Sequence, residues 1–402
     1  MALDAATTLA FALAGVSLGV VSGLTPGLHA NNFALMLASF APALPGSPLA
    51  VGVAMLAAGV VHTFLDVVPA LALGVPDAAM AASALPGHRL VLAGRGREAL
   101  YLSALGSGLA VLLAVPLAIP LTRAMEVAYP TLRAWLPALL AGVVVALAVT
   151  ESSVRAAVAG LAVFALAAVL GAVSLDVSPS APLSAGGILA PLFGGLFGAP
   201  VLLDAVGGSG VPAQEDADVT LRPASVATTA AAGAGAGALV GYLPGVSAAI
   251  GAVLSLPFVP GRTGARGFLV ATSGANTANT VFALFALVAL GMPRTGVMVA
   301  LDRARVPLSL PTLLTAVALA ASLGFVLVLT IGDYYLRTVG RVDPDVLSYA
   351  TLCGLVVVSY LFAGGVGVLV FGVATCLGLV PPRVGTRRVH LMGVLYPAIL
   401  FP

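Results

Sequence analysis

The sequence predicts an all-α polytopic membrane protein of two structural repeats, expected to be inverted, with about 10–12 transmembrane helices. The chain has 402 residues, of which 60% are hydrophobic and only 8% are charged, with a mean hydropathy of +1.13. Soluble domains carry roughly 25% charged residues, so the composition favours a multi-pass protein of the cell membrane. In addition, each half contains a Pro-Gly break inside apolar sequence, and similar Gly and Pro landmarks follow each break in the same order.

Apolar segments fill most of the chain and form two sets that follow the same order. The first set covers about 5–26, 27–43, 47–76, 99–122, 133–150, 155–174 and 185–204, and the second covers about 224–243, 244–259, 265–291, 308–331, 347–362, 364–380 and 388–402. A full crossing needs about 20 apolar residues, so the short segments after the breaks are expected to be broken or re-entrant helices. We predict a membrane repeat over 1–206, a polar linker loop over 207–222 and a second membrane repeat over 223–402.

Glycines at helical spacing precede each Pro-Gly break. Gly15, Gly19 and Gly23 lead to Pro26-Gly27, and Gly233, Gly237 and Gly241 lead to Pro244-Gly245. Glycine at every fourth position permits close contact between membrane helices. A helix that begins after such a break exposes unpaired N–H groups and the positive end of its dipole. We therefore expect carboxylates to bind at these breaks without the help of a buried arginine.

Polar side chains in the apolar segments are few, which makes each one a candidate. The predicted substrate-binding residues are Pro26, Gly27, Asn31, Asn32, Pro244, Gly245, Ser247, Asn276, Thr277, Asn279 and Thr280, and the predicted ion-coupling residues are His29, His62, Thr63 and Asp66. Alignment of the halves places His62-Thr63 opposite Asn279-Thr280. The two breaks and these two polar turns are therefore expected to converge at the pseudo-symmetry axis. Their amide, hydroxyl and backbone oxygens would suit a bound sodium ion, and we predict no other cofactor.

His62 and Asp66 are four residues apart and share one face of a predicted helix. Three interpretations stay open at this point. The pair couples transport to a proton or another ion; or it forms a metal site with His29, which would make the protein a membrane-embedded metal-dependent enzyme; or Asp66 lies near the membrane surface and only orients His62. A channel is a further alternative, which a continuous pore would support.

The basic residues are all arginine, since the chain contains no lysine. This excludes a lysine Schiff base and a Walker-type phosphate loop, and no long basic tract indicates nucleic-acid binding. Two loops, 77–98 and about 294–305, are rich in arginine. They occupy equivalent places in the two halves, so inverted repeats would put them on opposite sides of the membrane. The positive-inside rule would put both in the cytoplasm, and the orientation therefore stays open.

Three stretches resemble the TctA family, the large membrane subunit of the tripartite tricarboxylate transporters. Residues 85–100, LPGHRLVLAGRGREAL, are similar to the family's loop DGYPMARKGQAGRALG. Residues 273–293, from SGANTAN to LGMP, are similar to EVANNAAAGG…LTLGIPG, and residues 388–397, RVHLMGVLYP, are similar to RRVHLMGVLILP. The chain departs from the pattern in its separated asparagines, Asn276 and Asn279, and in the run His29-Ala30-Asn31-Asn32 after the first break. It resembles a divergent, short branch of the family.

The resemblance implies a function. Members of the family take up di- or tricarboxylates by secondary transport, driven by a sodium or proton gradient. They usually work with a small membrane subunit and an extracytoplasmic binding protein. For this chain the resemblance therefore implies a symporter in the lipid bilayer, with a small carboxylate as its substrate. We expect transport by alternating access and no enzymatic activity.

Overall fold

A computed structural model describes residues 2–25, 30–74, 84–183, 187–207, 211–243 and 246–401. Every regular element in these ranges is helical, and none of them is a strand. The predicted all-α class is therefore confirmed. Eight helices in the described ranges are long and apolar enough to cross a membrane: Ala5–Leu24, Pro48–Leu73, Gly96–Ala134, Val154–Ser174, Pro223–Tyr242, Gly264–Leu290, Leu310–Val339 and Pro344–Val384.

The eight long helices are fewer than the expected crossings, because three apolar helices (Leu136–Val149, Leu189–Ala205 and Arg388–Leu400) are shorter and because two predicted segments form one helix, α16 (Pro344–Gly378). It joins two segments that the sequence analysis separates, 347–362 and 364–380. The backbone leaves the helical region at Ala363 and at Gly364, whose φ of +59° favours glycine. The carbonyl of Leu361 accepts a hydrogen bond of 3.0 Å from the N–H of Leu183. The bend therefore divides α16 into two arms and anchors the segment that follows α8 (Val154–Ser174).

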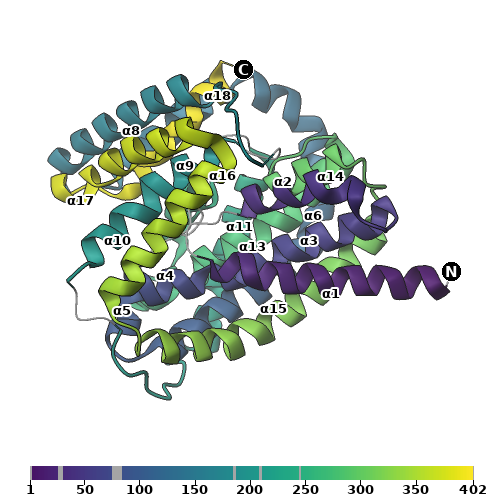
Figure 1. Cartoon of the computed structure of the whole chain (residues 1–402), viewed down its shortest axis with the longest axis horizontal. Helices are drawn as coiled ribbons and strands as arrows, with labels where there is room; N and C mark the ends of the chain where they lie inside the picture. The colour runs from purple at the N-terminus through teal and green to yellow at the C-terminus, as the bar shows by residue number, and fades with distance from the viewer. Residues whose placement is uncertain are drawn as a thin grey trace.

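The first bundle packs around the larger hydrophobic core. It contains α1 (Ala2–Leu24), α3 (Pro48–Leu65), α4 (Val67–Leu73), α6 (Gly96–Ala134), α11 (Pro223–Tyr242), α13 (Gly264–Leu290) and α15 (Leu310–Val339). In Figure 1 these helices occupy the side of the molecule that carries the N-terminus. Helix α3 is buried along almost its whole length, so it forms the centre of this bundle.

The second bundle has a hydrophobic core of its own. It contains α7 (Leu136–Val149), α8 (Val154–Ser174), α9 (Leu189–Phe193), α12 (Ala248–Ser255), α16, η6 (Arg388–Leu395) and α18 (Tyr396–Leu400). Figure 1 shows α8, α16 and α18 together on the side of the C-terminus. Both bundles take helices from both halves of the chain. The division into two cores therefore does not follow the predicted division into two repeats.

The order of long and short helices in the first half recurs in the second. The first half runs α1, α2 (Ala30–Phe40), α3, α5 (Ala84–Leu92) and α6, and the second runs α11, α12, α13, α14 (Gly296–Arg303) and α15. This order agrees with a repeat, although the inverted relation between the halves stays a prediction. The two arginine-rich stretches expected as loops contain α5 and α14. Short amphipathic helices satisfy their own backbone hydrogen bonds, which a plain loop cannot do.

The glycines before each break lie where two helices touch. Gly15 and Gly19 of α1 face Ala54 and Ala58 of α3, and Gly233 and Gly237 of α11 face Ala271 and Ala278 of α13. A Cβ at any of these positions would meet the backbone or Cβ of the facing helix at less than ordinary contact distance. The predicted close helix contacts are thus present, because glycine removes the side chain that would separate the axes.

Residues 211–221 of the predicted linker lie against the first bundle, and we call them the linker strap. Their anchor is Glu98 of α6, whose side chain is fully buried. Its carboxylate accepts hydrogen bonds from the guanidinium groups of Arg95 and Arg266, at 2.7 to 2.9 Å. It also accepts from the backbone N–H and the hydroxyl of Thr220, at 3.0 and 2.7 Å. The strap is a mostly exposed loop, and the hydrogen bonds from Thr220 to the buried carboxylate tie it to α6 and, through Arg266, to α13.

Candidate functional site

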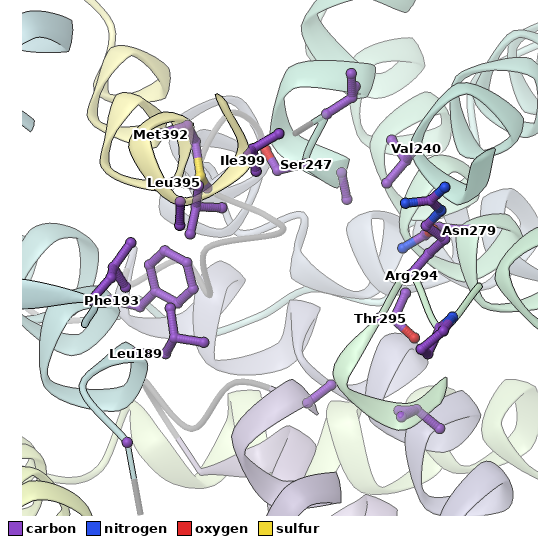
Figure 2. A pocket seen from close by; sticks show the side chains of 18 of the residues that line it. Leu189, Phe193, Val240, Ser247, Asn279, Arg294, Thr295, Met392, Leu395 and Ile399 are labelled. Carbon is purple, nitrogen blue, oxygen red and sulfur yellow. The ribbon is translucent and has the colours of Figure 1, made fainter. Parts of the chain in front are cut away.

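A cavity of about 950 Å³ lies between the two bundles. Its lining comes from the ends of both short helices that follow the breaks, from α3 and α13, and from α9, η6 and α18. The polar lining residues are Thr63, Asp176, Ser178, Ser247, Asn276, Asn279, Thr280, Arg294, Thr295 and Arg303. Figure 2 shows Arg294, Asn279 and Thr295 on the side opposite Leu189 and Phe193. The side with Arg294, Asn279 and Thr295 comes from the first bundle, and we call it the polar wall; the side with Leu189 and Phe193 comes from the second bundle, and we call it the apolar wall (Figure 2).

The two polar turns predicted to converge do meet at this cavity. Thr63 of α3 and Thr280 of α13 both line it, as do Asn276 and Asn279. The backbone carbonyl of Thr63 accepts a hydrogen bond of 3.5 Å from the hydroxyl of Thr277. Thr277 itself is fully buried behind the wall and is not part of the lining. Close packing of α3 against α13 therefore brings the two turns to one place.

Asp66 is buried beneath the polar wall, with 3% of its surface exposed. Its carboxylate accepts a hydrogen bond of 2.7 Å from the side-chain amide of Asn276. Asp66 also ends α3 and begins α4, so it lies at a junction between two helical segments. Burial within the bundle does not fix the depth of Asp66 in the membrane, so its position near the membrane surface stays one of the three interpretations. The carboxylate is directly linked to a residue of the cavity wall.

His62 lies on the same helix as Asp66 but turns to a different partner. Its Nδ1 is 3.0 Å from the hydroxyl of Ser22 on α1. Within the described ranges, no three or more His, Cys, Asp or Glu side chains are grouped closely enough to hold a metal ion. His29, the third member of the hypothesised metal site, lies outside the described residues. The joint ion-coupling role of His62 and Asp66 therefore stays a prediction, and the described contacts link His62 to α1 and Asp66 to α13.

Hydroxyl groups that the sequence analysis missed extend the polar region into the first bundle. The hydroxyl of Ser107 on α6 accepts a hydrogen bond of 2.9 Å from Thr277, and Ser103 lies 2.8 Å from the hydroxyl of Ser273. Ser103 and Ser107 are four residues apart, so their spacing was a signal that they share a helix face. Serines are common in membrane helices, however, and the sequence alone gave no reason to join them to α13.

Both breaks lead to helices that begin at the cavity. Helix α1 ends at Leu24 and α2 begins at Ala30, while α11 ends at Tyr242 and α12 begins at Ala248. Of these starts, Ala30, Ser247 and Ala248 line the cavity, and the hydroxyl of Ser247 accepts a hydrogen bond of 3.3 Å from the N–H of Ile250. Ser247 therefore caps α12. Pro26, Gly27, Pro244 and Gly245 lie outside the described residues, and Asn31 and Asn32 are described only as part of α2.

Arg294 is a lining residue that the sequence analysis placed in a loop. It follows the end of α13, where Gly291 closes the helix with a φ of +63°. Its guanidinium donates to the hydroxyl of Tyr129 and stacks over that ring, with Cζ 5.1 Å from the ring centre. Arg294 therefore lines the same cavity as the helix starts where carboxylates are expected to bind without a buried arginine, and that expectation stays a prediction. The sequence did not indicate this position, because whether Arg294 reaches the cavity depends on how the segment after α13 folds back.

The apolar wall is held by a charged cluster behind it. Glu151, between α7 and α8, accepts hydrogen bonds of 2.9 Å from Arg387 and from Nε2 of His390. Burial raises the pKa of the Glu151 carboxyl, but the bonds from Arg387 and His390 outweigh burial and hold the pKa below 4.5. Burial also lowers the pKa of His390, and its effect exceeds the opposing effect of the hydrogen bond to Glu151. The cluster fixes η6, which supplies Met392 and Leu395 to the cavity.

The long apolar helices and the inter-bundle cavity define a multi-pass membrane protein with a site between helices, as a transport component requires. The chain belongs to the Tripartite tricarboxylate transporter TctA family, which matches residues 9–393. This is a family of transporter components and not of enzymes, as the sequence analysis expected. The chain is also similar to an uncharacterized protein of Methanocaldococcus jannaschii, with 26% identity over 410 residues and 98% of each chain covered. No solved structure matches the chain.

Proposed function

We propose that this protein is a secondary active transporter of organic anions, namely di- or tricarboxylates, and that the inter-bundle cavity is its substrate site. The observation that carries the proposal is the meeting of two polar turns, one from each half, at a single cavity between two separate cores. Membership of the TctA family supports the carboxylate class. Carriers commonly place such a site between repeats, near the middle of the membrane.

The carboxylates rest at the starts of α2 and α12 in this proposal. The first N–H groups of a helix have no partner within the helix, and the dipole makes this end positive. Ala30, Ser247 and Ala248 bring both helix starts to the cavity. The polar wall then supplies the remaining hydrogen bonds, through Asn279 and Thr280. The side chain of Asn32 is a further proposed contact, as the sequence analysis suggests.

The coupling cation binds near Asp66 in this proposal. Asp66 is a buried carboxylate, and its hydrogen-bonded neighbour Asn276 is part of the cavity wall. A buried negative charge favours uptake of a sodium ion or a proton, because either would neutralise it. The link through Asn276 gives a physical route by which the cation would organise the polar wall for the substrate.

Alternating access follows from movement of one bundle relative to the other. Each bundle has its own hydrophobic core, so each can keep its packing while the interface between them changes. The interface already contains a cavity rather than a continuous core. The TctA family works with a small membrane subunit and a binding protein outside the cell. We propose the same partners for this chain.

Uptake into proteoliposomes tests this proposal. Purified protein would be reconstituted with labelled citrate or succinate outside, under an imposed sodium or proton gradient. We expect accumulation that depends on one of the two gradients. Asp66→Asn removes the charge that the cation neutralises, so accumulation should fall more than tenfold, while exchange of internal for external carboxylate continues. Asp302→Asn is the matched control, because Asp302 is exposed on α14.

Two results would contradict the proposal. If no carboxylate accumulates under either gradient, the protein is not a carrier of this class by itself. Reconstitution with the small membrane subunit and the binding protein then decides whether these partners restore uptake. If Asp66→Asn keeps full gradient dependence, the cation binds elsewhere and the coupling role of this residue is wrong.

A further inference from the structure

We propose that Arg294 binds one carboxylate group of the substrate and that Tyr129 positions it. This inference rests on the proposed function, since it assigns a binding role to a charged residue of the same cavity. It differs from the interpretation of the sequence, which assigned the carboxylates to helix starts alone. The segment from 291 to 295, between α13 and α14, takes on a binding role here.

The position of Arg294 is fixed by the chain on both sides. Gly291 adopts the left-handed conformation and ends α13, and Thr295 caps α14 by accepting a hydrogen bond of 3.3 Å from the N–H of Met298. Only a few residues separate these two helix ends, so the backbone there has little freedom. Arg294, Thr295 and the neighbouring Pro293 all line the cavity. Figure 2 places Arg294 on the same wall as Asn279.

The contacts of the guanidinium leave donors available. Its Nη2 meets the hydroxyl of Tyr129 and lies 2.8 Å from the sulfur of Met292. The ring of Tyr129 supports the planar face of the group, a geometry that favours a cation. The Nε atom is buried and has no hydrogen-bond partner among the described residues. A buried donor without a partner costs free energy, and an acceptor placed beside it would recover that cost.

Charge distinguishes Arg294 from the other buried or half-buried arginines. Arg266 pairs with Glu98, Arg387 with Glu151, and Arg388 with Asp204. No acidic side chain in the described ranges forms an ion pair with Arg294. Asp176, the acidic residue of the lining, is exposed and stays beyond ion-pair distance. A cation that faces a membrane cavity without a counter-ion attracts an anion, and the fork of a guanidinium matches the two oxygens of a carboxylate.

The position of Arg294 also bears on the class of substrate. One carboxylate at Arg294 and others at the starts of α2 and α12 would hold a di- or tricarboxylate by separate contacts. A cavity of about 950 Å³ is large enough for such an acid with its bound water. An acid with a single carboxylate would make only one of these contacts. The site would therefore discriminate by the number of carboxylates, and Arg294 would contribute to that choice.

Substitutions at Arg294 test the inference through binding and uptake together. Arg294→Gln keeps much of the volume and removes the charge, and Arg294→Lys keeps the charge without the fork. We expect Arg294→Gln to raise the KM for citrate uptake roughly ten- to hundredfold, from the loss of a charge-assisted contact, with a smaller change in Vmax. Arg294→Lys should lie between wild type and Arg294→Gln. Tyr129→Phe removes the hydroxyl that holds the guanidinium, so a rise of roughly three- to tenfold is expected.

The control variant is Arg305→Gln, which removes the same charge from an exposed position outside the cavity on the segment that follows α14. It should leave the KM unchanged. Thermal unfolding of each purified variant, with and without citrate, supplies a readout that does not depend on transport. Citrate should raise the unfolding temperature of wild type and of Arg305→Gln, and should raise that of Arg294→Gln much less.

The outcomes separate this inference from the function on which it rests. If wild type neither transports nor binds any carboxylate, the proposed function fails and the inference fails with it. If wild type transports citrate and Arg294→Gln keeps the same KM and the same stabilisation, the inference alone is overturned. Equal effects of Arg294→Gln and Arg305→Gln would also overturn it, because they would show only a general effect of charge. If Arg294→Gln does not fold, the KM of Arg294→Lys decides.

Discussion

The buried carboxylates of this protein differ in the partners that hold them. Glu98 and Glu151 each bind arginine, and each ties a connecting segment to a bundle. Asp66 instead accepts a hydrogen bond from the neutral amide of Asn276, next to the cavity. An arginine partner keeps a carboxylate ionised and in place. The ion pairs therefore support structural roles for Glu98 and Glu151, whereas the hydrogen bond from Asn276 connects Asp66 to the cavity wall.

Glu151 is expected to stabilise the folded protein in a pH-dependent way. Its pKa in the folded state is below 4.5, so the unfolded chain binds a proton more readily than the folded chain does. The stabilisation is then present at pH 7 and is lost as pH falls through the folded pKa. Glu151→Gln should lower the free energy of unfolding by about 1–3 kcal/mol at pH 7. The difference between the two proteins should shrink as pH approaches 4.

Thermal unfolding in detergent between pH 4 and pH 8 measures this difference. Titration of carboxylates elsewhere affects wild type and Glu151→Gln alike and cancels in the comparison. Asp343→Asn, in an exposed N-cap of α16, controls for loss of any carboxylate. A difference that stays constant over the whole pH range would show that folding leaves the pKa of Glu151 unchanged, and the assignment of a lowered pKa would be wrong.

At the scale of elements, the glycine faces of α1 and α11 decide how the polar turns reach the cavity. Gly237 of α11 is buried against α13, and a Cβ there would lie 2.7 Å from the Cβ of Ala278 and 2.9 Å from the backbone N of Asn279. The axes would then have to move apart, and Asn279 would move with α13. Glycine at position 237 is therefore needed both for the close packing of α11 against α13 and for the position of Asn279, a proposed binding residue.

Gly237→Ala and Gly235→Ala form a matched pair on α11. Gly235 is exposed, with nothing near the position of its Cβ, whereas Gly237 is buried against α13. We expect Gly237→Ala to cost about 1–3 kcal/mol from overpacking and to reduce carboxylate uptake. Gly235→Ala should be neutral or slightly stabilising, because alanine favours helix. Unfolding temperature and uptake measured on both variants check this, and equal stability of the two would contradict the close contact of α11 with α13.

At the scale of the whole molecule, the two cores and the cavity between them are the main feature. The linker strap joins the halves but is bound to the first bundle through Glu98, so it belongs to that bundle. The connections between the bundles include α6 leading to α7 and α15 leading to α16. A movement between the bundles would therefore be taken up at these connections.

Thr280→Cys is expected to report that movement. Thr280 is 5% exposed and lines the cavity. In a background in which Cys353 and Cys376 are replaced by serine, a membrane-impermeant thiol reagent should label Cys at 280 from one side of the membrane. A saturating carboxylate with the coupling gradient should change the labelling rate severalfold and permit labelling from the other side. A cysteine at exposed Asp302 is the control, and labelling from one side only in every condition would contradict alternating access.

Much of the site could be predicted from residue types, because polar residues are conspicuous in an apolar chain. Asn276, Asn279 and Thr280 stood out in this way, and all three line the cavity. Arg294 did not, because a charged residue just beyond an apolar segment is ordinary at a membrane surface. Ser107 did not, because small hydroxyl residues pack well in any membrane helix. Composition shows where polar residues lie along the chain. It does not show whether such a residue faces an internal cavity or the membrane surface once the segment folds back.

The sequence by itself determined that the protein is an all-helical membrane protein, where most of its helices lie and which glycines face a neighbour. These properties depend on composition and on periodicity along one helix. Only the tertiary structure decided that both bundles combine helices from both halves, that Asp66 meets Asn276, and that Arg294 faces the cavity. Such pairings join residues far apart in the chain. Packing of whole helices against each other selects them, and no local pattern specifies that choice.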